Sequence, residues 1–122
     1  MSKFVTLLVE DDALQREVLS DVLRAEKYEV IECATGEAAE LVVATTGTEL
    51  QALVTDQNLG GGMSGAELAE YAREKFPRMN VILMSGQETP RLPPSVLFLR
   101  KPFPPPALLA AIRKSDPLTA HS

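Results

Sequence analysis

The chain has 122 residues, 45% of them hydrophobic, which is typical of one domain with its own core. Its formal net charge of −5 argues against nonspecific binding to nucleic acid, and no apolar stretch is long enough to cross a bilayer. The single cysteine, Cys33, excludes an internal disulfide, and with no signal-like N-terminus we expect a cytoplasmic protein without nucleic-acid or membrane partners.

Apolar runs of strand length alternate with helical patterns along the chain. Phe4–Val9 is nearly continuously apolar, as in a strand buried on both faces, and Ala13–Lys27 then shows the apolar spacing of a helix. The same reasoning predicts further strands at Tyr28–Cys33, Ala52–Thr55, Val81–Met84 and Val96–Leu99, and helices at Thr35–Thr46, Gly65–Phe76 and Pro104–Lys114. This alternation indicates an α/β fold with a mainly parallel sheet and helices on both faces. We expect residues 1–115 to form one domain and residues 116–122 a frayed tail.

The segment Gly86–Ser95 breaks the alternation. Parallel strands normally need a crossover of about a dozen residues or more, usually a helix. This segment is shorter and contains Pro90, Pro93 and Pro94, which disfavour helical backbone at and before each proline. We therefore predict no helix longer than one turn between the fourth and fifth strands.

Side chains suited to phosphoryl chemistry follow four of the predicted strands. Glu10 and Asp11 follow the first strand, and Asp56, Ser85 and Lys101 follow the third, fourth and fifth strands. The carboxyl ends of parallel strands lie along one edge of a sheet, where open α/β folds bind ligands. Carboxylates suit Mg²⁺, a carboxylate can attack phosphorus, and an ammonium can pair with phosphoryl oxygens.

Each of these residues also has a purely structural interpretation. Asp11 or Asp12 can cap the following helix, and taken alone the cap is the better interpretation. Asp56 precedes a glycine-rich turn, and Ser85 before a glycine is commonly a turn residue. A surface lysine such as Lys101 is usually solvated. The glycines at 60–62 are interpreted as loop geometry, because phosphate-binding loops usually follow the first strand and carry a lysine.

Four motifs in order resemble the receiver domain of two-component response regulators, the CheY-like family, over nearly the whole chain. They are Leu7–Asp12 (LLVEDD), Leu53–Asp56 (LVTD), Val81–Gly86 (VILMSG) and Phe98–Phe103 (FLRKPF). The resemblance implies a flavodoxin-like, doubly wound, five-stranded parallel sheet with strand order 2-1-3-4-5. With the short crossover, the usual fourth helix is expected to be short or absent.

The resemblance also implies a phosphoacceptor and a metal site. Asp56 would accept a phosphoryl group from a histidine kinase or phosphotransfer protein. Asp11, Asp56 and the backbone carbonyl of Asn58 would ligate Mg²⁺, and Glu10 would help through a bound water.

A conformational switch is implied as well. Ser85 would contact the phosphoryl group, Lys101 would pair with it, and Phe98 falls at the aromatic switch position. The sequence departs from the family pattern at Gly60, where many receivers have proline in a shorter loop, and at the short crossover, which alters the usual output face.

The function expected from these features is that of a stand-alone phosphoacceptor switch rather than an enzyme. It would signal through protein partners or act as a phosphate sink. The alternative is a phosphate-independent pseudo-receiver that only binds proteins. An aspartate-nucleophile phosphatase is less favoured, because that class usually has its nucleophile after the first strand. A DNA-binding regulator is least favoured, given the negative charge and the lack of a helix-turn-helix segment.

Overall fold

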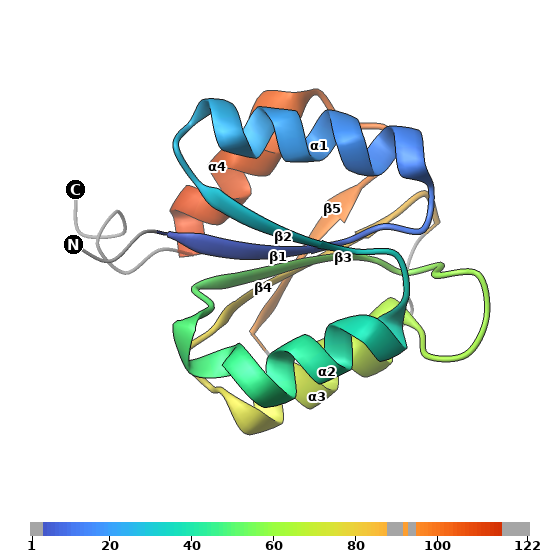
Figure 1. Ribbon diagram of the computed structural model, residues 1–122. Helices are drawn as coiled ribbons and strands as arrows, with labels where there is room; N and C mark the ends of the chain where they lie inside the picture. Colours follow the sequence, from blue (N-terminus) through green and yellow to red (C-terminus); the bar gives the residue numbers. More distant parts are fainter. Residues whose placement is uncertain (1–3, 88–91, 93–94, 116–122) are drawn as a thin grey trace.

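The computed structural model describes residues 4–87, 92 and 95–115, which form a three-layer α/β structure (Figure 1). Within them a five-stranded parallel sheet has the order β2-β1-β3-β4-β5. Helices α1 and α4 cover one face of the sheet, and α2 and α3 cover the other (Figure 1). The strands are β1 Val5–Val9, β2 Glu29–Cys33, β3 Ala52–Asp56, β4 Asn80–Ser85 and β5 Val96–Arg100. The helices are α1 Ala13–Ala25, α2 Gly36–Thr46, the short 3-10 helix η1 Gly47–Glu49, α3 Gly65–Lys75 and α4 Pro105–Ser115.

This architecture confirms the predicted fold class, strand order and short crossover. Of the segment Gly86–Ser95 the structure describes residues 86, 87, 92 and 95, and none of these is helical. No helix therefore separates β4 from β5 in the described part of the chain, and α4 is the helix that follows β5. The other residues of this segment, and the tail predicted at 116–122, lie outside the described residues.

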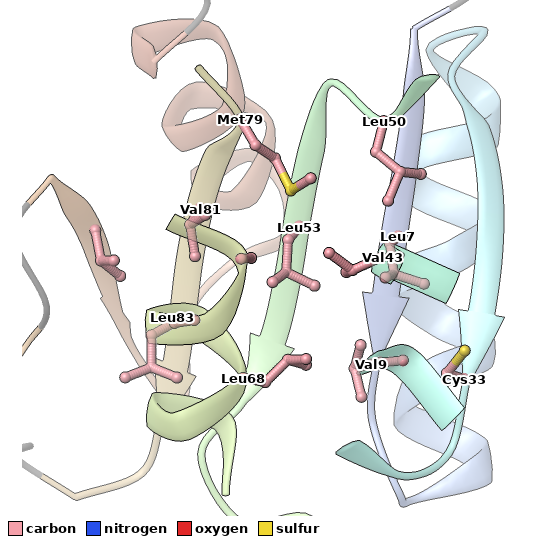
Figure 2. Packing of buried hydrophobic residues seen from close by; sticks show 14 of the residues in the cluster. Leu7, Val9, Cys33, Val43, Leu50, Leu53, Leu68, Met79, Val81 and Leu83 are labelled. Carbon is pink, nitrogen blue, oxygen red and sulfur yellow. The ribbon is translucent and has the colours of Figure 1, made fainter. Parts of the chain in front are cut away.

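Two apolar clusters hold the helices to the two faces of the sheet. Alternate residues of the central strands supply each cluster, because successive side chains of a strand point to opposite faces. Leu7, Leu53 and Leu83 pack toward α2 and α3 (Figure 2), whereas Leu8 and Val54 pack toward α1 and α4. Burial on both faces explains why the central strands read as continuous apolar runs. The central strands that end at the carboxyl edge of the sheet are therefore packed on both faces.

The helix starts follow from local capping. Asp12 caps α1, its Oδ1 accepting a 2.9 Å hydrogen bond from the backbone N of Gln15, and Thr35 caps α2 in the same way. Ser64 and Glu67 form a reciprocal capping box at the start of α3. Since Asp12 is the residue that caps α1, the carboxylate of Asp11 is not occupied by that cap.

The last three strands extend slightly further than predicted, whereas β1 and β2 each begin one residue later than predicted. Asp56 and Ser85 are therefore the last residues of β3 and β4 rather than the first residues after them. The ladder continues because the backbone N of Gln57 donates to Met84 O at 2.8 Å and that of Lys101 donates to Ser85 O at 2.8 Å. These sheet hydrogen bonds fix the backbone from which the chemical side chains project.

Among the described residues, no helix is long and apolar enough to cross a membrane.

Candidate functional site

Three carboxylates meet at the carboxyl edge of the sheet, as the strand ends predicted. One carboxylate oxygen from each of Glu10, Asp11 and Asp56 lies within 4.8 Å of those of the other two. Glu10 is fully buried, Asp56 is 9% exposed, and Asp11 is exposed. When ionised, three carboxylates this close repel one another, so the cluster favours a cation.

The ammonium of Lys101, at the end of β5, enters this cluster. Its Nζ lies 2.8 Å from Glu10 Oε1 and 3.4 Å from Asp56 Oδ1, and it also donates to Gln15 Oε1 at 2.8 Å. Burial alone would lower the pKa of Lys101, but the hydrogen bond to Glu10 and the nearby carboxylate charges raise it overall. The lysine therefore stays charged. The peptide bond from Lys101 to Pro102 is cis.

Gln15 was not singled out from the sequence. The available signal is its position in the first turn of α1, three residues after the capping residue Asp12, which places it close in the chain to the acids that follow β1.

Glu10 carries an unsatisfied polar atom into the cluster. Its Oε2 is buried and has no hydrogen-bond partner among the described residues. Burial raises the pKa of Glu10 to about 7; the hydrogen bond from Lys101 opposes this rise, and the charge of Asp56 adds to it. An unpartnered buried carboxylate oxygen calls for a ligand such as a cation or its bound water. The donor set therefore fits a hard divalent cation such as Mg²⁺.

Ser85 lies on the strand beside Asp56. Asp56 pairs with Met84 in the β3–β4 register, so Ser85 sits one position further along the neighbouring strand. It is 3% exposed, and its Oγ accepts a 3.1 Å hydrogen bond from the backbone N of Gln87.

The two remaining predicted site residues lie on β5 and in the loop after β3. Phe98 lies on β5 opposite Leu83 and is partly buried. Asn58 is exposed, in the loop two residues after Asp56.

The backbone around Asp56 is tightly packed against the start of α3. Gln57 N donates to Asp56 Oδ1 at 3.0 Å, Gly65 N donates to Gln57 O at 3.0 Å, and Ala66 N donates to Gln57 Oε1 at 2.8 Å. A Cβ at Gly65 would overlap the carbonyl oxygen of Asp56. Neither Gln57 nor Gly65 was assigned a site role from the sequence. For Gly65, the available signal was a glycine at the first position of a predicted helix.

The glycine loop between β3 and α3 has the geometry that its composition indicated. Gly60 and Gly62 have φ of 87° and 73°, values that favour glycine. Glu37 of α2 holds the loop, because its Oε2 accepts a 2.7 Å hydrogen bond from Met63 N. This hydrogen bond holds the pKa of Glu37 below its usual value.

An apolar groove borders the acid cluster on the α1 side. Leu14 and Val18 on its α1 wall are 71% and 48% exposed. The groove has a volume of about 370 Å³, and its lining comprises Leu14, Gln15, Val18, Leu19, Lys101, Pro102 and Phe103. Leu14 and Val18 lie one helical turn apart, so they form one small apolar patch on α1.

The chain is similar in sequence and in fold to known receiver domains. A family model described as response regulator receiver domain matches residues 6–113. The response regulator protein FleR of Pseudomonas aeruginosa is 38% identical over 80 residues, which cover 66% of this chain and 16% of FleR. The solved receiver domain of the hybrid histidine kinase CckA is 33% identical, with a TM-score of 0.77 over 91% of this chain and 97% of that one. A response regulator receiver protein from Sinorhizobium medicae has the same fold, with a TM-score of 0.87, 23% identity and coverage of 93% and 94%.

Proposed function

The chain belongs to the response regulator receiver domain family, and we propose that it accepts a phosphoryl group on Asp56 from the phosphohistidine of a histidine kinase or phosphotransfer protein. The observation that supports this most directly is the meeting of Glu10, Asp11 and Asp56 within 4.8 Å, with Lys101 Nζ 3.4 Å from Asp56 Oδ1. We place this activity in the cytoplasm and the receiver in residues 1–115.

The proposed transfer is a simple displacement at phosphorus. A carboxylate oxygen of Asp56 forms a bond to phosphorus while the bond from phosphorus to the donor's imidazole nitrogen breaks. That nitrogen keeps the electron pair, and the imidazole leaves neutral when its other nitrogen carries a proton. Lys101 offsets charge on the transferred group, and such positioning and charge neutralisation account for most of phosphoryl-transfer catalysis.

Mg²⁺ is the cofactor that we propose for this site. Asp11, Asp56 and the backbone carbonyl of Asn58 would hold it, with Glu10 contributing through a water. When bound, it supplies positive charge to the phosphoryl oxygens. The unpartnered Oε2 of Glu10 supports this assignment.

The signalling output is proposed to start at Ser85 and Phe98. The Ser85 hydroxyl, whose oxygen accepts a hydrogen bond from Gln87 N, would donate its own proton to the new phosphoryl group. Phe98 would then respond on the neighbouring strand. Such a switch is a two-state element biased by a local charge change. A protein partner would recognise the phosphorylated state, or the receiver would serve only as a phosphate sink.

The direct test is labelling by a small phosphodonor. Purified protein is incubated with acetyl phosphate, with and without Mg²⁺, and its intact mass is recorded. We expect one phosphoryl adduct, and only with Mg²⁺. If no adduct forms, a beryllofluoride titration followed by NMR tests for a short-lived phosphoryl state. No response in either experiment would favour a phosphate-independent pseudo-receiver.

The pH dependence of Mg²⁺ binding provides a further prediction. The pKa of Glu10 is raised from 4.5 to about 7 in the folded chain, so the folded state binds more protons than the unfolded state between these values. The free energy of unfolding without metal therefore falls as pH rises through this window. Mg²⁺ prefers the ionised carboxylate, so its affinity should rise about tenfold from pH 6 to pH 8.

Calorimetric titration at pH 6, 7 and 8 measures this dependence. Glu10→Gln removes the titrating group and should flatten the profile, whereas Asp11→Asn should weaken binding and keep the slope. A flat profile for the unaltered chain would contradict the prediction.

The groove beside Lys101 is proposed to receive the protein that carries the phosphohistidine, because that histidine must reach Asp56 while the rest of its carrier rests on neighbouring surface. Leu14→Ser removes a large exposed apolar contact from the groove wall. Transfer from a phosphorylated histidine protein that labels the unaltered chain should then slow by about tenfold, as expected for loss of a central contact. Labelling by acetyl phosphate should stay unchanged, because the small donor needs no groove.

A matched control is available on the opposite side of the sheet. Leu41 of α2 is 65% exposed, so Leu41→Ser makes the same change away from the groove. Equal slowing by both substitutions would argue against this docking surface.

A further inference from the structure

The ammonium of Lys101 contacts the amide of Gln15 as well as the carboxylates at the strand ends. Within the described part of the chain its Nζ has three oxygen neighbours, which are Glu10 Oε1 at 2.8 Å, Gln15 Oε1 at 2.8 Å and Asp56 Oδ1 at 3.4 Å. An ammonium has three donors and no acceptor, so the amide of Gln15 takes one donor at the same short distance as Glu10. Asp56 is the most distant of the three.

The first turn of α1 fixes where this amide lies. The backbone N of Gln15 is bound by the capping side chain of Asp12 at 2.9 Å. The next residue, Arg16, donates from its guanidinium to the carbonyl oxygen of Glu10 at 2.7 Å. The same helical turn therefore anchors the backbone of Glu10 and the ammonium of Lys101.

We propose that Gln15 is a positioning residue that holds the Lys101 ammonium for phosphoryl transfer. By sharing the ammonium with Glu10, it keeps Nζ from closing on Asp56, so the attacking oxygen of Asp56 stays available. The ammonium is then in place for the phosphoryl oxygens. An amide does this without adding a negative charge beside the incoming phosphoryl group. The inference rests on the proposed function of Asp56.

Gln15→Met tests the role, because methionine has a similar length, lacks the amide oxygen and keeps the groove apolar. We expect labelling by acetyl phosphate with Mg²⁺ to slow about 3- to 10-fold, the scale of a modest misplacement of a reacting group. In a Lys101→Met background the same substitution should have no further effect, since Gln15 acts through Lys101. Ala25→Met, at the exposed far end of α1, is the control and should label at the unaltered rate.

A second measurement does not depend on phosphorylation. NMR of the side-chain ammonium of Lys101 reports how fast its protons exchange with water, and Gln15→Met should speed this exchange by removing one acceptor. An unaltered labelling rate in Gln15→Met, or equal slowing with and without Lys101, would overturn the inference. If the unaltered chain is not labelled at all, the proposed function fails. The ammonium exchange of Gln15→Met remains informative in that case: faster exchange shows that Gln15 holds Lys101, and unchanged exchange shows that it does not.

Discussion

Asp56→Asn is expected to abolish labelling by acetyl phosphate and Mg²⁺ completely. The substitution replaces the attacking carboxylate by an amide of nearly the same shape, which is not a nucleophile toward phosphorus under these conditions. The remaining amide oxygen can still accept the hydrogen bond that Gln57 N now donates to Asp56 Oδ1, so the fold should persist. Intact mass spectrometry, with a thermal melt beside it, measures both outcomes.

Asp12→Asn is the matched control for this experiment. Asp12 caps α1 through its side chain, and asparagine caps helices about as well as aspartate. This variant should label like the unaltered chain. A phosphoryl adduct that persisted on Asp56→Asn would remove Asp56 as the acceptor and require another nucleophile.

Gly65→Ala is expected to destabilise the fold and to displace the phosphoacceptor. Alanine in a helix usually stabilises it relative to glycine by about 0.5–1 kcal/mol. Here the new Cβ would overlap the backbone oxygen of Asp56, and backbone on a central strand cannot move aside easily. Overpacking of this kind costs about 1–3 kcal/mol, so the steric term should win and the free energy of unfolding should fall.

Gly61→Ala separates this steric effect from any general effect of losing a glycine. A Cβ at Gly61 meets no atom within 4 Å, so its effect on stability should stay within about 0.5 kcal/mol. Denaturant unfolding of both variants, with acetyl phosphate labelling, tests the prediction. Equal stability of the two variants would show that α3 can shift away from Asp56.

Ser85 and Asp56 lie within their strands, which differs from the positions predicted for them. Both were expected just after their strands, but they are the last residues of β4 and β3. The register pairs Asp56 with Met84 and Ser85 with Arg100, so both residues are held by sheet hydrogen bonds. A phosphoryl group on Asp56 would therefore form next to the end of β4, where the carbonyl oxygen of Ser85 accepts a hydrogen bond from Lys101 N.

The helices and strands, their order in the chain and the sheet edge that carries the chemical side chains were all predictable from the sequence. Apolar periodicity and strand–helix alternation are local properties, and the strand order followed from the family resemblance. Glu10, Asp11, Asp56, Ser85 and Lys101 were found because each stands at a strand end, and parallel strands end at one edge.

Which side chains contact one another at that edge depends on the tertiary structure. Lys101 is 91 positions from Glu10 and 86 from Gln15, so these contacts depend on strand register and on the placement of α1 over the sheet. The burial that raises the pKa of Glu10 and leaves its Oε2 unpartnered has the same origin. The close approach of Gly65 to Asp56 likewise arises only when α3 packs on β3. Local patterns specify which elements form, whereas distances, desolvation and steric fit are set by chain segments that meet only on folding.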